Sequence, residues 1–295
     1  MITEIATKIG FPEEATVYLE NCHNELMKDP ALYSKLYDAV DLLYINADRS
    51  YLAVTESIAE KSGIHKYTVD RIMLLIAARP LRYIYKNAGI SEEIFYDTMS
   101  DFKCKLYECK NVYGIWGTFV SWWYPKTFFA LNAFKLGRLE YERVKFPCKE
   151  YKDVLKEGDT VYSCHIPSAG PVTPGSVMES LKLAYDFFHP ELKDGILPVY
   201  CSSWMLHPDH YDKVYHEGSN LKAFYEMFDV FDSCINESNH NFWRIFNEEF
   251  SRDTLADAPE NTTLQRNFKK YLLAGNNMGT GKGILLFDGE KIINK

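Results

Sequence analysis

The second half of this chain takes its fold from Val161-Tyr-Ser-Cys-His-Ile-Pro-Ser-Ala-Gly-Pro-Val-Thr-Pro174. A strand is predicted over Asp159–Ile166, and Pro167–Pro171 supplies a loop of small residues. Thr173 followed by Pro174 is typical of a helix start, because Pro fits the first helical position. A strand that passes through a short loop into a helix indicates a layered α/β structure.

Strands and helices continue to alternate on both sides of this stretch. Leu136–Phe146 alternates imperfectly between polar and apolar residues, as a half-exposed strand does. Further strands are predicted over Leu197–Ser203, Val230–Ile235, Phe242–Phe246 and Gly283–Phe287, and helices over Thr173–Phe188, Pro208–His216, Asn220–Phe228 and Thr263–Leu273. This order predicts a mixed α/β domain with helices packed on a central sheet.

The first half, from Ile2 to about Asn132, has a helical pattern instead. Asp29-Pro30 and Ser91-Glu-Glu93 are typical helix starts, and apolar residues then recur at helical spacing. Five to seven helices are expected, without an internal repeat. The predicted fold class is therefore α+β, with an all-helical N-terminal domain over 1–133 and a mixed α/β domain over 134–295.

Composition excludes several classes of protein. The chain has 295 residues, of which 46% are apolar and 25% charged, as in a globular protein with a large core. Proteins that bind nucleic acids through the phosphates usually carry an excess of basic residues, whereas this chain has a net charge of −8. No nucleic-acid partner is therefore predicted. Met1–Gly10 shows no basic region followed by an apolar core, and the most apolar run, Ile72–Ala78, is too short for a membrane span. Neither export nor a membrane partner is therefore expected.

The seven cysteines are scattered, odd in number and include no C-x-x-C pair. This spacing of the cysteines supports neither a disulfide framework nor a zinc site. Reduced thiols in a cytoplasmic protein are therefore predicted. His207 and His210 can share a helix face as metal ligands, but a third ligand and an H-E-x-x-H pattern are missing. No metal is predicted.

The loop after His165 is suited to an anion. Small side chains at Ser168, Ala169 and Gly170 let a ligand approach the backbone. Free amides and the positive end of the helix that starts near Thr173 favour a phosphate or pyrophosphate. The same residue types also serve any ordinary strand-to-helix turn. His165 is a candidate general base, or else a residue that only makes a structural hydrogen bond.

The predicted strand Leu197–Ser203 ends in polar groups that can hydrogen-bond a ligand, among them Cys201, Ser202, Ser203 and Trp204. Cys201 with His165 is one possible nucleophile and base, which would make the protein a thiol hydrolase. Neither a G-x-S-x-G motif nor a cysteine-protease signature surrounds Cys201, and an inert buried thiol is the alternative.

Gly279-Thr-Gly-Lys-Gly283 suggests a phosphate-binding loop, but its context does not fit. Gly283 stands where that motif has Ser or Thr, and the segment leads from a helix into a strand rather than the reverse. A glycine cap at Gly275 followed by a flexible turn is expected here.

Taken together, these segments resemble a family of bacterial acyltransferase-like proteins with an all-helical N-terminal domain and a GNAT-like C-terminal domain. In the first half the resemblance rests on Ala88-Gly-Ile-Ser-Glu-Glu-Ile94, Asp97-Thr-Met-Ser-Asp101 and, at the junction, Leu136-Gly-Arg-Leu-Glu-Tyr-Glu142. In the second half it rests on His165–Pro174, Cys201-Ser-Ser-Trp-Met-Leu-His-Pro208, Ser219-Asn-Leu-Lys-Ala-Phe224, Asn261-Thr-Thr-Leu-Gln-Arg266 and the late glycine segment. The resemblance covers the chain nearly end to end.

This resemblance implies acyl transfer from acetyl-CoA or another acyl-CoA to the amine of a small-molecule acceptor. Pantetheine would lie along the strand that ends at His165 and Ile166. The cofactor-binding positions that the resemblance then implies are Ile166, Ser168, Ala169, Gly170 and Thr173, with Cys201 and Ser202 beside the acyl group.

The resemblance also implies catalytic roles. The amine attacks the thioester directly, so a base, an oxyanion donor and an acid suffice and no protein nucleophile is needed. His165 would be the base, with Glu142 in reserve. Tyr211, or failing that Tyr215, would be the acid that protonates the leaving thiolate.

One departure from the family pattern concerns the pyrophosphate loop. That loop usually begins with Arg or Gln, whereas Pro167–Pro171 contains neither, and Pro171 has no amide to donate. A chain that kept the fold but lost coenzyme A would be a non-catalytic protein that binds a small metabolite, and this is the alternative function. The sequence leaves the acyl chain length, the acceptor and the oligomeric state open.

Overall fold

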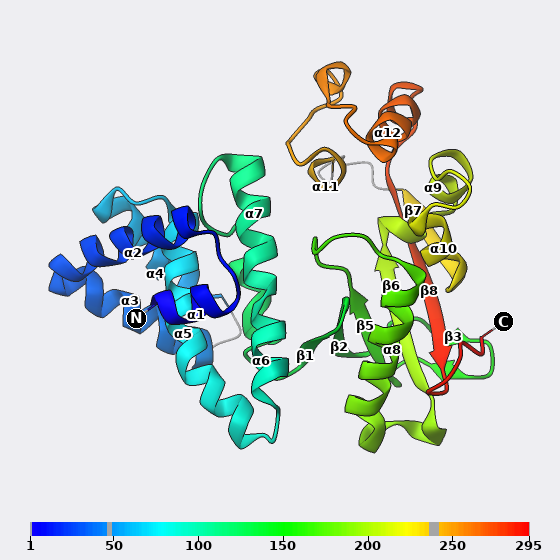
Figure 1. Ribbon diagram of the computed structural model, residues 1–295, viewed down its shortest axis with the longest axis horizontal. Helices are drawn as coiled ribbons and strands as arrows, with labels where there is room; N and C mark the ends of the chain where they lie inside the picture. Colours follow the sequence, from blue (N-terminus) through cyan, green and yellow to red (C-terminus); the bar gives the residue numbers. More distant parts are fainter. Residues whose placement is uncertain (1, 46–48, 236–241, 295) are drawn as a thin grey trace. The chain divides into compact units, whose positions relative to one another are not determined.

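The computed structural model describes residues 2–45, 49–235 and 242–294. The chain folds into two compact units, Met1–Phe134 and Lys135–Lys295. The first unit is helical, and the second is a mixed sheet with helices (Figure 1). This architecture confirms the predicted α+β class.

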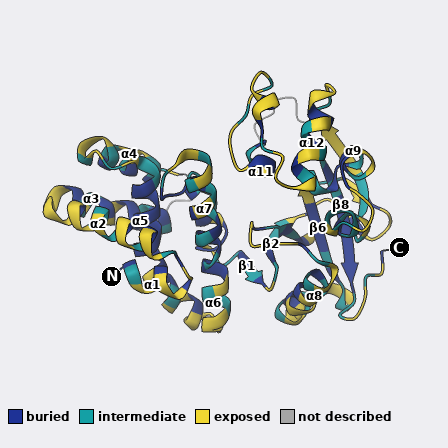
Figure 2. Cartoon of the chain, turned by 45° about the horizontal axis from the view of Figure 1, so that its top comes forward, coloured by how far each residue is buried: buried dark blue, intermediate teal, exposed yellow. Residues whose placement is uncertain are grey.

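Seven α-helices make up the described part of the first unit, and α5 is its core. The helices are α1 (Ile2–Lys8), α2 (Glu13–Lys28), α3 (Pro30–Ile45), α4 (Tyr51–Ser62), α5 (Lys66–Asn87), α6 (Glu92–Met99) and α7 (Asp101–Tyr113), followed by the 3-10 helix η1 (Ser121–Lys126). Every residue of α5 from Thr68 to Ala78 is buried, and Figure 2 colours this helix mostly dark blue. A helix buried on all sides is stable only when neighbouring helices surround it.

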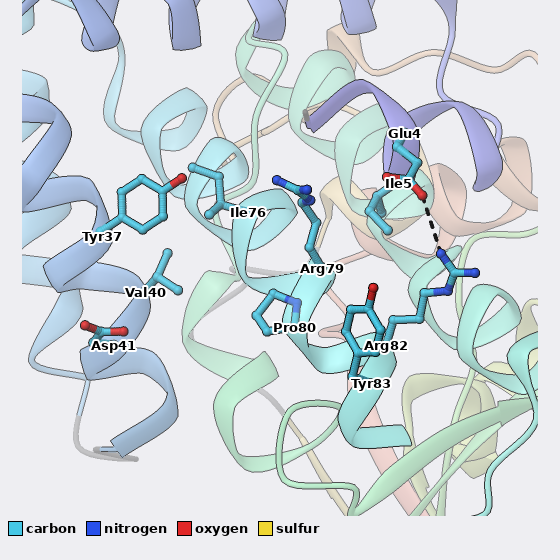
Figure 3. A pocket seen from close by; sticks show the side chains of 10 residues that line it. All are labelled: Glu4, Ile5, Tyr37, Val40, Asp41, Ile76, Arg79, Pro80, Arg82 and Tyr83. Carbon is cyan, nitrogen blue, oxygen red and sulfur yellow. Dashed lines mark hydrogen bonds and ion pairs between the residues drawn. The ribbon is translucent and has the colours of Figure 1, made fainter. Parts of the chain in front are cut away.

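A cavity of about 430 Å³ lies in the helical unit beside a break in the hydrogen bonding of α5. Pro80 has no amide to donate to the carbonyl of Ile76 one turn earlier. Figure 3 shows Arg79 and Pro80 at the cavity wall, with Arg82 turned to Glu4, whose Oε1 lies 3.4 Å from its Nη1. None of the residues that the sequence predicted for the functional site lines this cavity.

The second unit is built on a six-stranded sheet in the order β1-β2-β5-β6-β8-β7. The strands are β1 (Ala133–Leu136), β2 (Leu139–Lys145), β5 (Thr160–His165), β6 (Leu197–Ser203), β7 (Asp229–Ile235) and β8 (Gly279–Phe287), and the short strands β3 (Glu150–Tyr151) and β4 (Leu155–Lys156) pair separately. β5 and β6 run parallel, whereas β2 pairs with β5, and β8 with both β6 and β7, in antiparallel fashion.

Helix α8 (Pro174–Phe188) makes the crossover that two parallel neighbours require. It begins as predicted, because the Thr173 hydroxyl accepts a hydrogen bond from the Ser176 amide and Pro174 is the first helical residue. The rings of Phe188 and Tyr162 lie 4.2 Å apart, so α8 covers the sheet face of Tyr162. Side chains alternate between the two faces of a strand, and His165 therefore lies on the opposite face.

A hairpin turn at Gly137 and Arg138 separates β1 from β2, where the sequence predicted a single strand over Leu136–Phe146. Gly137 has φ +72°, a backbone conformation that favours glycine. A Cβ at this position would also lie 3.1 Å from Leu183 and 3.3 Å from Ser180. The close approach of the hairpin to α8 is a tertiary contact, which the alternation of polar and apolar residues does not report.

The strand predicted over Phe242–Phe246 is wrong, because this segment forms helix α11 (Trp243–Phe246). Phe242, Ile245 and Phe246 bury one side of it in an apolar cluster with residues of α12 (Thr263–Leu273). The remaining elements are η2 (His189–Glu191), η3 (Lys193–Gly195), η4 (Trp204–Leu206), α9 (Pro208–Lys213), α10 (Asn220–Glu226) and η5 (Leu255–Asp257). In the described ranges, no helix has both the length and the apolar character to cross a membrane.

The flexible turn predicted at Gly279–Gly283 is also wrong, because these residues form the first half of β8. A Cβ at Gly281 would overlap the carbonyl of Leu206, and one at Gly279 would overlap the ring of His207. The glycines therefore let η4 and the residue after it lie directly against the strand.

Candidate functional site

β5 and β6 separate at their carboxyl ends. They pair only through Tyr162 with Val199 and Ser163 with Tyr200, although β5 continues to His165 and β6 to Ser203. Beyond the last pair, each strand remains bonded to its outer neighbour, β2 or β8. The hydrogen-bond ladder between the two parallel strands thus ends inside the sheet, and the strand edges beyond it border an opening.

A cavity of about 270 Å³ occupies this opening. It is lined by the ends of β5 and β6, by η4, by the beginning of β8 and by one residue of α11. The lining residues are Cys164, His165, Ile166, Ser202, Ser203, Trp204, Met205, Arg244, Met278, Gly279 and Thr280. Three of the predicted site residues, His165, Ile166 and Ser202, are therefore together here.

His165 is paired with Glu142, the residue predicted as its reserve. The Nε2 atom of His165 lies 2.8 Å from Oε2 of Glu142, and 33% of the His165 side chain is exposed. Glu142 lies opposite Ser163 in the β2–β5 register, which places its side chain on the same sheet face as His165. A carboxylate can only accept, so the neutral imidazole donates its Nε2 proton and carries its basic lone pair on Nδ1.

Cys201 points to the other face of the sheet and does not line the cavity. Cys201 is fully buried. Its thiol is hydrogen-bonded to that of Cys164, and this hydrogen bond, together with the burial of Cys164, holds the pKa of the Cys164 thiol well above its usual value. Cys201 and His165 thus lie on opposite faces, so the structure does not bring together the nucleophile and base of the thiol-hydrolase hypothesis. None of the seven cysteines forms a disulfide.

The predicted anion loop lies on the surface outside the cavity. Ser168, Ala169, Gly170 and Pro171 are exposed, and the space around Gly170 and Gly175 is open. The Ala169 amide donates inward to the Pro167 carbonyl, 2.8 Å away. Thr173 is engaged as the cap of α8. In the described part of the chain, the amides of Gly170 and Val172 donate to no other group.

The two candidate acids occupy different surroundings. Tyr211, on α9, donates its hydroxyl hydrogen bond to Glu226 over 2.8 Å and stacks on Tyr225, and it does not line the cavity. Tyr215 is buried and does not line the cavity either, but its hydroxyl donates over 3.3 Å to the carbonyl of Met205, which does. Burial holds the pKa of Tyr215 well above its usual value.

His210 forms hydrogen bonds with two residues that line the cavity, Gly279 and Trp204. Its Nε2 accepts a hydrogen bond from the Gly279 amide at 3.3 Å, and its Nδ1 lies 2.8 Å from the Trp204 carbonyl. The neutral ring protonated on Nδ1 satisfies both partners. Burial lowers the pKa of His210 to about 4, and burial also lowers the pKa of the neighbouring His207. Within the described ranges, no group of three or more His, Cys, Asp or Glu side chains is arranged to hold a metal ion.

Sequence reasoning missed several residues of this region. Met205, Met278 and Arg244 line the cavity, and Arg138 contacts the anion loop. Arg244 lies in the segment wrongly predicted as a strand, so its approach to the cavity had no sequence signal. Met278 and Thr280 lie on either side of Gly279, in a segment that the sequence predicted to be a turn.

Comparison with known families identifies both halves of the chain. Residues 1–130 match the N-acyltransferase N-terminal domain, and residues 133–285 match the GNAT-like C-terminal domain. A comparison with curated proteins returned no match.

Solved acyltransferase structures share the fold. One, in complex with decanoyl-CoA and teicoplanin, has a TM-score of 0.74 at 20% identity, over 95% of this chain and 86% of that chain. Another, with CoA and 10C-teicoplanin, has a TM-score of 0.63 at 19% identity, over 96% and 98%. A third, with decanoyl-CoA, has a TM-score of 0.64 at 20% identity, over 96% and 98%. With both domain matches in place, the chain belongs to the family that joins an N-acyltransferase N-terminal domain to a GNAT-like C-terminal domain.

Proposed function

We propose that this protein transfers an acyl group from an acyl-CoA to the amine of a small molecule. The observation that carries this proposal is the separation of β5 from β6 above a cavity that contains His165. The open loop and the start of α8 directly follow β5, so one end of the site suits a thioester arm and the other suits a diphosphate.

Pantetheine is extended and contains two amides, and it can therefore bind in the opening as an added strand does at a sheet edge. Ile166 and Ser202 line that path. The diphosphate would be received by the exposed residues Ser168, Ala169 and Gly170 and by the beginning of α8 after Thr173, because backbone amides at a helix N-terminus attract anions. Cys201 would contribute only as a buried support of β6.

The proposed chemistry is direct attack of the amine on the thioester carbonyl. His165 takes the proton of the amine, while Glu142 holds the ring orientation and stabilises the imidazolium that forms. A carbon–nitrogen bond forms, the carbon–sulfur bond breaks, and the thiolate leaves with a proton from an acid. Tyr215 is the better-placed acid because its hydroxyl bonds to a residue of the cavity wall, and Tyr211 is the second candidate.

The solved relatives support an acyl-CoA as cosubstrate and a small molecule as acceptor, because their structures contain decanoyl-CoA or CoA together with teicoplanin or its 10C form. We propose acetyl-CoA or a longer acyl-CoA as the cosubstrate of this protein. A reducing, cytoplasmic location is likewise proposed from the seven free cysteines.

Calorimetry with the full chain tests cofactor binding. Acetyl-, octanoyl- and decanoyl-CoA are titrated separately, and at least one is expected to bind. The ligand that binds is then incubated with a panel of primary amines, including amino sugars, and release of free CoA thiol is followed. Loss of turnover in His165→Gln with retained binding would assign the activity to this site.

The alternative, a non-catalytic protein that binds a small metabolite, draws on the loop Pro167–Pro171, which has no Arg or Gln of its own. Absence of heat with all three acyl-CoAs, together with a thermal shift by an unrelated metabolite, would favour that alternative.

A further inference from the structure

We propose that Arg138 is a positioning residue for the diphosphate of coenzyme A, and that it replaces the basic residue missing from the loop. The inference rests on the proposed acyl-CoA function. It assigns to the β1–β2 hairpin a role that no part of the loop sequence indicates, since Arg138 precedes the loop by about thirty residues.

Arg138 donates hydrogen bonds to two backbone carbonyls of the loop Pro167–Pro171. Its Nη2 donates to the Gly170 carbonyl at 2.6 Å, and its Nε donates to the Pro171 carbonyl at 3.1 Å. The planar guanidinium presents its N–H groups as a rigid fork, so two neighbouring carbonyls fix both the position and the orientation of the loop. The contacts join the hairpin to the loop, two segments that are distant in sequence.

The hairpin that carries Arg138 is itself fixed to α8. The Ser180 hydroxyl donates to the Leu136 carbonyl at 2.5 Å and accepts from the Leu139 amide at 3.1 Å. These bonds lie on either side of Arg138 in the sequence. The guanidinium therefore projects from a rigid base, and α8, the loop and the hairpin form one connected unit.

Peptide geometry links the contact to anion binding. In a trans peptide the carbonyl and the amide N–H point in opposite directions. Arg138 draws the Pro171 carbonyl toward the hairpin, so the N–H of Val172 in the same peptide unit points away from it. Within the described residues, neither the Val172 amide nor the Gly170 amide donates a hydrogen bond to another group. The contact thus fixes the direction of the Val172 amide near the Gly170 amide, and both can serve as donors to an anion at the loop.

The test compares two ligands that differ only in the nucleotide part. Decanoyl-CoA contains the diphosphate, whereas decanoyl-pantetheine contains the same thioester arm without it; if another acyl chain binds wild type better, both ligands carry that chain. Affinity of the full chain for each is measured by calorimetry for wild type, Arg138→Gln, Arg138→Lys and Arg143→Gln. Arg143 is the matched control, because it lies on the strand β2 that follows Arg138 but pairs with Glu191, at 2.5 and 2.7 Å.

Arg138→Gln is expected to weaken acyl-CoA binding roughly 10- to 100-fold, the range of a lost charge-assisted hydrogen bond, and to leave acyl-pantetheine binding unchanged. Arg138→Lys should recover part of the loss, and Arg143→Gln should match wild type. Equal weakening for both ligands, or no weakening of acyl-CoA, would overturn the role of Arg138. If wild type itself binds acyl-pantetheine but gains nothing from the nucleotide, this inference fails while the proposed function stands. Binding of neither ligand by wild type refutes both.

Discussion

The imidazole of His165 and the carboxylate of Glu142 form a hydrogen bond of 2.8 Å across the antiparallel strands β5 and β2. The pair lies on the sheet face opposite α8, at the point where β5 leaves β6. Because the carboxylate accepts the Nε2 proton, the tautomer with a basic Nδ1 is favoured in the resting protein. Glu142 thereby fixes the orientation of the His165 ring.

His165→Gln is expected to lower kcat by about 10²- to 10⁴-fold, the usual contribution of a general base, with little change in KM for the acyl-CoA. Glu142→Gln should have a smaller effect in the same direction, because it removes the orientation of the ring but not the base. Steady-state kinetics across a range of pH checks both. A pH–rate profile in His165→Gln that matches wild type would remove His165 from this role.

Tyr215→Phe is expected to reduce kcat more than Tyr211→Phe. Tyr215 bonds to the carbonyl of the cavity-lining Met205, whereas Tyr211 is held by Glu226 away from the cavity. The comparison is matched because each variant loses one hydroxyl. Both variants should keep the thermal stability of wild type to within a few degrees. The reverse order of effects would assign the acid to Tyr211 instead.

Gly281→Ala is expected to destabilise the protein by about 1–3 kcal/mol or more, the usual cost of overpacking, because the new methyl group would overlap the Leu206 backbone. Gly175→Ala is the control: Gly175 lies in α8 with open space around it, so alanine should be neutral or slightly stabilising there. Chemical unfolding followed by circular dichroism measures both. Equal stability of the two variants would contradict the close packing of η4 on β8.

Stability is expected to fall as the pH is lowered from about 6.5 to about 4. Burial holds the pKa of His210 at about 4 in the folded state, against an ordinary value of 6.5, so the unfolded chain binds the proton more tightly. The contribution of this residue is complete above pH 6.5, decreases below it, and levels off below about 4. The total is on the order of 3 kcal/mol.

Urea unfolding at pH 7.5, 5.5 and 4.5 measures this dependence in wild type and His210→Gln. The variant is expected to lose less stability between the first and last pH than wild type does. His207, whose pKa burial also lowers, remains in both proteins and supplies a common background. An identical loss in the two proteins would show that His210 does not carry the effect.

The fold class and most of the helices and strands follow from local sequence patterns. Helix starts such as Thr173-Pro174 and Ser91 are local, because the cap and the capped amides lie within three residues of one another. The same locality explains why the strand ending at His165 and the loop after it were predicted. His165 was identified in this way, whereas Ile166 and the role of Ser202 came from the family resemblance; all three line one cavity.

The surroundings of those residues depend instead on packing between distant segments. The separation of β5 from β6 depends on pairing between distant strands, and Glu142 meets His165 only through the register of β2 on β5. The glycines of β8 were predicted to form a turn. Glycine is needed there because η4 packs closely on the strand, and this contact between distant segments leaves no pattern in the local sequence. Arg138 reaches the loop because Ser180 holds its hairpin to α8. Local hydrogen bonds are encoded by neighbouring residues, whereas contacts between distant segments arise only when the whole sheet has formed.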